Sequence, residues 1–181
     1  MVAPTTYLLL FRGVGGPVQL PVARLREALA KAGFKNPTTY INSGNAVVSS
    51  TLARNSVHAQ VVEICEREFA YDRPIFVVTA AEWDALIKND PFPQKAEGKH
   101  VHAVLLAGAP DPDTLEKIRA LAVGGEELEL VDGVCYIHTP HGFGRSKMAE
   151  KFDRWIGVEN TGRNWNTVLK MQELARAIGT E

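Results

Sequence analysis

Five consecutive apolar residues, Tyr7 to Phe11, lie near the N-terminus of this chain of 181 residues. An unbroken apolar run, without the alternation of a half-exposed strand, is typical of a central strand that is buried on both faces. The turn-forming sequence Arg12-Gly-Val-Gly-Gly-Pro follows directly and ends the strand. The fold therefore has to contain a sheet whose middle is covered on both sides.

Apolar spacing and turn residues predict the next five elements. We expect helices at Val22 to Gly33 and Val57 to Phe69. We expect strands at Thr38 to Ile41, Ala46 to Ser49 and Ile75 to Val78. Asn42 to Asn45 has turn chemistry and makes a hairpin of the middle two strands, so Ser43 is interpreted as a turn residue and not as a nucleophile. The order strand, helix, strand, strand, helix, strand is that of a split βαβ, ferredoxin-like unit.

The second half of the chain repeats this order in part. A capping-box signature, Thr79 to Glu82, opens a short helix, and the polar segment that ends at Lys99 is the best candidate for a linker. After it we expect strand, helix, strand, strand, helix and helix, with the last strand missing or replaced. The prediction is an α+β chain with two similar βαββα-type subdomains, the first ferredoxin-like, and C-terminal helices. The expected division is 1–80, a helix and linker at 81–99, and 100–181 with a C-terminal helix pair.

The segment from Gly142 to Val168 contains the first helix of the predicted pair, the start of the second, and two of the three tryptophans. Ser146 is a plausible N-cap, and Met148, Phe152 and Trp155 recur at helical spacing, so we expect all three to face the core. Gly157 ends this helix. We expect Thr161, Gly162 and Arg163 to turn the chain into the next helix, which Asn164 caps.

Basic residues concentrate in the same segment. From Arg145 to Lys170 there are six basic and three acidic residues, and Lys147, Lys151 and Arg154 form a strip beside the apolar face. Because two helix N-termini expose N–H groups near guanidinium groups, the segment is a candidate anion site. Trp165 could offer a ring on which a ligand stacks. The predicted ligand-binding residues are Arg12, Arg145, Ser146, Lys147, Arg163, Asn164 and Trp165.

A structural interpretation of the same residues stays open. A charge run on a helix is usually a solvated face, and Glu150, Asp153 and Glu159 could pair with the cations. Arg163 would then pair with Asp153 or Glu159, and Trp165 would belong to the core. These two interpretations differ in whether any cation is free to meet a ligand.

Composition excludes several classes of protein. The formal net charge is −1, so no global field draws the chain to nucleic acid or membrane. No apolar run reaches about 18 residues and no signal peptide opens the chain, so we expect a cytoplasmic location without membrane association. Cys65 and Cys135 lack metal-ligand spacing and are interpreted as core residues. No metal or cofactor is predicted, and the oligomeric state is not determined by the sequence.

Other candidate chemistry is weak. The Gly-rich loop after Phe11 lacks the spacing of a phosphate-binding loop, and His100 and His102 alone do not make a metal site. The segment Asn45 to Ser49 has no aromatic residue, which argues against an RNA-recognition motif. No catalytic residue can be assigned.

Three segments together resemble one bacterial family. They read LLLFRGVGG from Leu8, TYINSGNAV from Thr39, and GRSKM from Gly144 through TGRNWNTV from Thr161. The chain is identified as a member of the family labelled domain of unknown function 1697. The resemblance implies a duplicated α+β protein and no established activity. The first loop departs from the family pattern, because it is short and has Val18-Gln19 where a Lys-Asn pair is usual.

Three functions are compatible with these observations. The favoured hypothesis is a protein that binds a phosphate-bearing ligand or nucleic acid through a basic C-terminal surface. An enzyme acting on a small anionic substrate would use Arg12, His141, Arg145 or Lys147. A structural or interaction module would bind no ligand.

Overall fold

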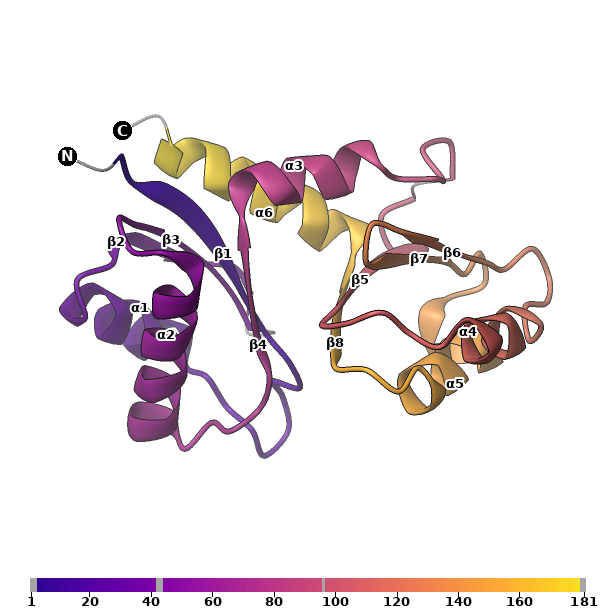
Figure 1. The fold of residues 1–181 in the computed structure, drawn as a ribbon, viewed down its shortest axis with the longest axis horizontal. Helices are drawn as coiled ribbons and strands as arrows, with labels where there is room; N and C mark the ends of the chain where they lie inside the picture. Colours follow the sequence, from indigo (N-terminus) through magenta and orange to yellow (C-terminus); the bar gives the residue numbers. More distant parts are fainter. Residues whose placement is uncertain (1–2, 42–43, 96, 180–181) are drawn as a thin grey trace. The chain divides into compact units, whose positions relative to one another are not determined.

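The computed structural model describes residues 3–41, 44–95 and 97–179 and divides the chain into two compact units (Figure 1). The first unit comprises Met1–Ala85 and Lys170–Glu181, and the second comprises Leu86–Leu169. The division falls inside helices α3 (Ala80–Lys88) and α6 (Trp165–Gly179), so each helix contributes to both units. The C-terminal segment, which we expected to belong entirely to the second subdomain, is thus divided between the two units. Helical periodicity shows that a helix has an apolar face but not which sheet that face meets.

The first unit is a four-stranded antiparallel sheet with two helices. Its elements are β1 (Thr5–Phe11), α1 (Val22–Lys31), β2 (Lys35–Thr39), β3 (Asn45–Ser50), α2 (Arg54–Phe69) and β4 (Ile75–Thr79). The strand order is β2-β3-β1-β4, so β1 lies between two partners as its apolar run predicts. Leu8, Leu9 and Leu10 are all fully buried, which confirms that both faces of β1 are covered.

One apolar cluster joins α1 and α2 to one face of this sheet. Leu25 and Leu29 of α1 and Val57 and Val61 of α2 pack with Leu9 and its neighbours in β1 and β3. Figure 1 shows both helices on the same side of the strands. The i, i+4 spacing within each helix gives it one buried stripe, so the sequence pattern determines which side of each helix faces the sheet.

The strand before the predicted hairpin differs from expectation. It runs over Lys35–Thr39 instead of residues 38–41, and it tolerates Pro37 because β2 is an edge strand. Ile41 adopts a positive φ of 48° and is 51% exposed, so it does not continue the strand. The predicted turn residues Asn42 and Ser43 lie outside the described residues.

The second unit has the same order of strands and helices as the first. It contains β5 (Val101–Leu106), α4 (Pro112–Arg119), β6 (Glu127–Val131), β7 (Val134–His138), a 3-10 turn η1 (Phe143–Arg145), α5 (Lys147–Trp155) and β8 (Asn160–Asn164). The sheet order β6-β7-β5-β8 corresponds strand by strand to that of the first unit. The predicted α+β chain of two similar subdomains is confirmed.

The predicted missing strand is present, which corrects the sequence analysis. Residues Asn160–Asn164 form β8 and pair with β5, whereas a turn was expected at Thr161 to Arg163, and α5 and α6 are therefore not consecutive. Gly, Asn and Arg are not typical strand residues, but pairing with a central strand overrides intrinsic preference. Gly162 lies opposite Val104, and a Cβ at that glycine would come within 3.2 Å of Val104 Cγ2.

The orientation of α5 also needs one correction. Met148 and Phe152 are buried as predicted, but Trp155 is 43% exposed. Trp155 is the last residue of the helix, and Ile156, just beyond it, packs in the core at 2% exposure. Gly157 then turns the chain with a φ of 72°, a conformation that favours glycine. The core position expected for Trp155 is therefore filled by the next residue.

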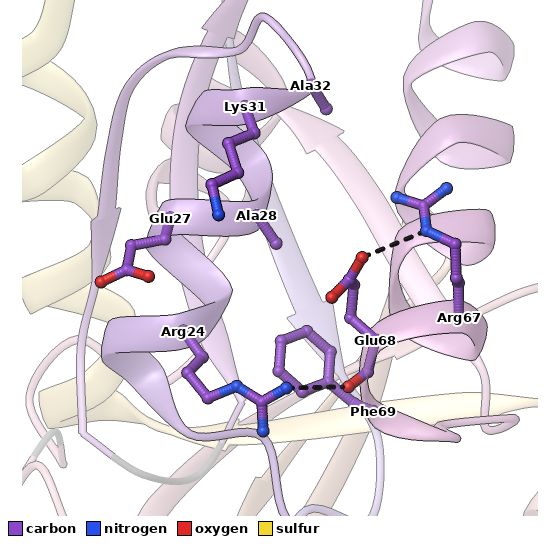
Figure 2. A pocket seen from close by; sticks show the side chains of 8 residues that line it. All are labelled: Arg24, Glu27, Ala28, Lys31, Ala32, Arg67, Glu68 and Phe69. Carbon is purple, nitrogen blue, oxygen red and sulfur yellow. Dashed lines mark hydrogen bonds and ion pairs between the residues drawn. The ribbon is translucent and has the colours of Figure 1, made fainter.

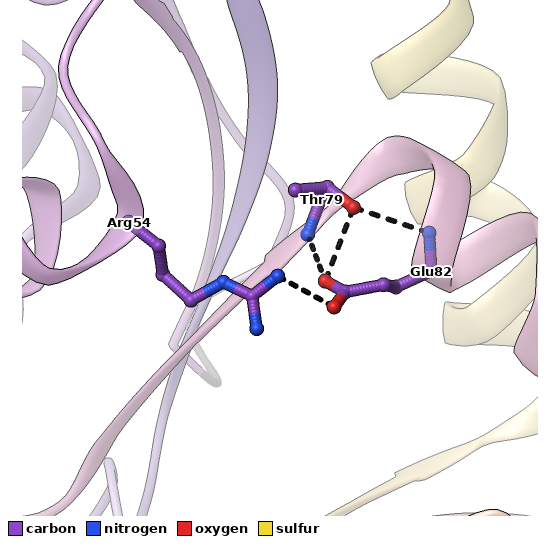
Figure 3. Close-up of polar contacts among 3 residues, drawn as sticks. All are labelled: Arg54, Thr79 and Glu82. Atoms are coloured by element: carbon purple, nitrogen blue, oxygen red, sulfur yellow. Dashed lines mark hydrogen bonds and ion pairs between the residues drawn. The ribbon is translucent and has the colours of Figure 1, made fainter.

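A capping box fixes the junction between β4 and α3, as the sequence predicted (Figure 3). The Glu82 carboxylate accepts hydrogen bonds from the Thr79 N–H at 2.8 Å and the Thr79 hydroxyl at 3.1 Å, and Thr79 Oγ1 accepts from the Glu82 N–H at 3.2 Å. Arg54 Nη2 lies 2.5 Å from the same carboxylate. Partial burial raises the pKa of Glu82, but the bonds from Thr79 and Arg54 outweigh burial and lower the pKa below its ordinary value.

Loss of this cap should weaken the first unit. Thr79→Ala removes the hydroxyl that accepts from the Glu82 N–H, and we expect the free energy of unfolding to fall by about 1 kcal/mol. Urea denaturation at neutral pH measures the difference. Thr51→Ala, at an exposed threonine just before α2, is the control and should change stability by less than about 0.5 kcal/mol. Equal stabilities of the two variants would contradict the capping role.

Candidate functional site

The N-terminus of α5 carries the strongest candidate for an anion site. The Ser146 hydroxyl accepts a hydrogen bond from the Ala149 N–H at 3.0 Å, so Ser146 caps the helix as predicted. The N–H groups of Lys147 and Met148, the next two at this end, have no acceptor in the part of the chain that the structure describes. Backbone N–H groups left in this way are suited to an anion.

Two exposed cations flank the cap. Arg145 and Lys147 are both exposed, and neither forms an ion pair within the described ranges. The other cations of α5 differ, because Lys151 and Arg154 each lie 3.6 Å from the Glu150 carboxylate. Pairing with Glu150 therefore accounts for Lys151 and Arg154 of the basic strip. It does not account for Lys147 or for Arg145, which precedes the strip.

The N-terminus of α6 is already occupied by protein acceptors. Asn164 Oδ1 accepts from the Thr167 N–H at 3.0 Å, which makes Asn164 the predicted cap. The Asn166 N–H donates to the Gly98 carbonyl at 3.1 Å. The chain passes so close there that a Cβ at Gly98 would lie 1.6 Å from Asn166 Oδ1. Two of the first three N–H groups of α6 are thus engaged and do not face a ligand.

Arg163 and Trp165 are buried, unlike Arg145. Arg163 lies in β8 at 9% exposure, and its Nη1 donates to Thr161 Oγ1 at 2.9 Å and to the Gly162 carbonyl at 2.7 Å. Trp165 is 5% exposed, and its ring centroid lies 6.4 Å from that of Tyr136. Burial gives both side chains a place in the packing of the second unit and agrees with the core interpretation of Trp165.

Strand register brings the start of α5 and the end of β8 to one end of the second sheet. His102 pairs with Asn164 across β5 and β8, and its ring lies 4.1 Å from the Phe143 ring of η1. His102 thus links Asn164, at the end of β8, to Phe143 of η1, which precedes Ser146 in the chain. The convergence of the predicted ligand-binding residues stays a prediction. Arg12 belongs to the first unit, where its N–H donates to the Pro74 carbonyl at 3.1 Å.

His102 supports η1 as an uncharged side chain. Burial lowers its pKa from 6.5 to about 4, so the imidazole is neutral at physiological pH. Its Nδ1 is buried without a hydrogen-bond partner in the described residues. A neutral ring can stack on Phe143 at little cost, whereas a protonated ring would place a charge in an apolar contact.

Acid should therefore destabilise the second unit through His102. The unfolded chain binds the proton near pH 6.5 and the folded chain only near pH 4, so stability is lost as pH falls through this window, by up to about 3 kcal/mol. His102→Leu removes this contribution, and we expect its free energy of unfolding to depend less on pH between 6.5 and 4 than that of the wild type. Urea denaturation at a series of pH values measures the difference. Parallel curves would show that His102 is not held neutral.

Exposure separates the roles of the two arginines. Arg163→Ala leaves the Thr161 hydroxyl and the Gly162 carbonyl without their donor and opens a cavity, so we expect stability to fall by about 1–3 kcal/mol. Arg145→Ala should change stability by less than about 0.5 kcal/mol, because its side chain is exposed. Chemical denaturation of the two variants compares them directly. A larger loss for Arg145 would reverse the assignment.

A pocket in the first unit was not predicted (Figure 2). It has a volume of about 320 Å³ and lies between α1 and the end of α2. Arg24 donates to the Glu68 carbonyl at 3.3 Å and lies over the Phe69 ring at 5.3 Å, while Arg67 pairs with Glu63 and Glu68 at 3.1 Å. Because these arginines are engaged with protein groups, the pocket is a weaker anion site than the start of α5. Only the packing of α1 against α2 creates it, so no local pattern could reveal it.

The described residues offer little catalytic chemistry. They contain no group of three His, Cys, Asp or Glu side chains that could hold a metal ion. Cys65 and Cys135 are buried as expected, and burial raises the pKa of each thiol to about 12, which makes both poor nucleophiles. His141 is exposed on the turn after β7, beside Gly124. Among the described helices, none has the length and hydropathy needed to cross a membrane.

Comparison with known proteins identifies the family and the fold but not an activity. A family model described as "Protein of unknown function (DUF1697)" matches residues 5–136. The solved structure of the conserved bacterial protein SP0830 from Streptococcus pneumoniae is similar, with a TM-score of 0.76 and 20% identity, and the match covers 96% of this chain and 99% of that one. At this identity the likeness shows the fold alone. The search of curated proteins found no match.

Proposed function

Because this chain belongs to the DUF1697 family, which is described only as a protein of unknown function, we propose its function from its own residues. The second unit binds a phosphate-bearing ligand at the N-terminus of α5, where Arg145, Ser146 and Lys147 lie in succession. The observation that carries this proposal is a contrast between neighbouring cations: Lys151 and Arg154 of α5 are paired with Glu150, whereas Lys147 of α5 and Arg145 of η1 have no ion-pair partner in the described part of the chain.

The chemistry of this end matches a phosphate group. Arg145 offers a planar guanidinium that can hold two oxygens at once, and Lys147 offers a mobile point charge. The N–H groups of Lys147 and Met148 add donors at the positive end of the helix dipole. Ser146 is 5% exposed and already bonded to Ala149, so it orients these groups and does not itself grip the ligand.

Arg163 and Asn164 contribute indirectly. Both were predicted as ligands, but Arg163 bonds Thr161 and Gly162, and Asn164 caps α6. Their role in this proposal is to hold β8 and α6 at the end of the sheet where η1 lies. Because η1 leads directly into α5, a rigid sheet end beneath η1 keeps the N-terminus of α5 in place for the ligand.

Pyrophosphate is a suitable probe for the proposal. A ligand at about ten times its dissociation constant stabilises the folded state by about 1.4 kcal/mol, which raises Tm by about 3–6 °C in a protein of this size. We expect this rise for the wild type and its loss when Arg145→Ala and Lys147→Ala are combined. Differential scanning fluorimetry at low and high salt measures it, and the rise should shrink with salt.

A matched control removes the same charge elsewhere. Lys35→Ala combined with Lys88→Ala takes two exposed lysines from outside α5 and should keep the full response. Lys147→Arg should also keep it, because the cation remains. A wild type without any response to pyrophosphate would favour the structural module. An undiminished response in the folded Arg145 and Lys147 double variant would place the anion elsewhere.

A further inference from the structure

The three tryptophans of this chain differ sharply in exposure. Trp83 is 1% exposed and Trp165 is 5% exposed, but Trp155 is 43% exposed at the end of α5. Large aromatic rings are buried on average, so a half-exposed indole is an unusual feature of a protein surface. Trp155 is also the aromatic residue that the sequence analysis expected in the core.

Trp155 continues the basic surface that begins at Arg145. Lys147, Lys151 and Trp155 are four residues apart and therefore share one face of α5, over about 12 Å of helix. Lys151 Nζ lies 5.8 Å from the centroid of the Trp155 ring. From Arg145 to Trp155 the sequence has four basic and two acidic residues, so the surface is positive. We call these four residues, Arg145, Lys147, Lys151 and Trp155, the α5 strip.

We propose that the ligand of the α5 strip is single-stranded nucleic acid. A base stacks on the exposed face of Trp155, and the phosphates that follow it bind Lys147 and Arg145. Lys151, whose ammonium also lies 3.6 Å from the Glu150 carboxylate, stands between Trp155 and Lys147 on the helix and adds less to the binding. This inference rests on the proposed function, because it uses the same anion site at the start of α5. It assigns the aromatic role to Trp155, whose ring is accessible, in place of the buried Trp165.

The geometry selects a single strand over a duplex. A ring on a helix surface can stack only on a base whose face is free, and the bases of a duplex already stack on each other. The length of about 12 Å corresponds to about three nucleotides at about 3.4 Å each along a stacked strand. A positive surface with one aromatic platform supplies affinity through stacking and charge, and both are tolerant of sequence.

Tryptophan fluorescence tests the stacking directly, because Trp155 alone of the three indoles is substantially exposed. The ligands are an oligothymidylate of about ten nucleotides, a length within the usual footprint of a single-strand site, and polyphosphate with the same number of phosphates. We expect the oligonucleotide to bind and quench the emission. Polyphosphate should bind with little quenching, since it has no base. The duplex of the same length should bind more weakly than the single strand.

Three variants separate stacking from charge. Trp155→Leu should weaken oligonucleotide binding by about 5- to 100-fold, the range that corresponds to one base stacked on an aromatic side chain. It should leave polyphosphate binding unchanged. Trp155→Phe keeps a ring and should restore most of the affinity. Val123→Ala, at a 67% exposed apolar residue of the same unit, is the control and should bind as the wild type does.

The outcomes distinguish the binding of single-stranded nucleic acid from the binding of a phosphate group alone at the start of α5. If polyphosphate binds, and the oligonucleotide binds no more tightly in the wild type than in Trp155→Leu, the nucleic-acid assignment is wrong and the anion site stands. If a duplex binds as tightly as the single strand without quenching, the assignment is also wrong. If neither polyphosphate nor oligonucleotide binds, both proposals fail.

Discussion

The second unit depends on the pairing of β5 with strands on both of its sides. β5 pairs with β7 on one side and β8 on the other, and the His102 side chain reaches Phe143 of η1. This one strand therefore determines where Arg163, Asn164 and the segment before α5 are held. The ladder hydrogen bonds supply the pairing, and Gly162 allows it, because a side chain there would press on Val104. Without β8, Arg163 would have no buried position and α6 would not begin beside the end of the sheet.

The two units show that strand order does not require similar strand composition. β4 of the first unit has the apolar sequence Ile75–Thr79, while its counterpart β8 is the polar sequence Asn160–Asn164. Both lie beside a buried central strand at the same place in the sheet order. A polar edge strand can occupy this position because its backbone groups bond to the neighbour whatever its side chains are. Its side chains can then make other contacts, and the Arg163 guanidinium donates to the Thr161 hydroxyl and to the Gly162 backbone carbonyl.

Features that depend on adjacent residues in the sequence were predictable. Features that depend on contacts with residues far away in the sequence were not. The apolar run of β1, the capping box at Thr79, and the caps at Ser146 and Asn164 each follow from a few adjacent residues, and the structure contains all of them. β8 was missed because its evidence lies in β5, more than fifty residues away. The orientation of Trp155 was missed because periodicity does not reveal where a helix stops covering its core. The ion pairs of Lys151 and Arg154 could be anticipated, but the lack of such a pair at Arg145 within residues 3–41, 44–95 and 97–179 could not.

The same residue types serve opposite purposes in this segment, and backbone position decides which. Arg163 and Trp165 follow each other closely at the end of the sheet, where pairing and packing bury them. Arg145 lies in η1 just before α5, and Trp155 is the last residue of α5, where Met148, Phe152 and the following Ile156 already supply the core contacts. A buried cation has to donate its hydrogen bonds to acceptors of the protein, whereas an exposed cation can donate them to water or to a ligand. A count of Arg and Trp residues in the segment therefore does not separate these roles. β8, the strand between α5 and α6, determines which of these side chains the fold buries and which it leaves exposed.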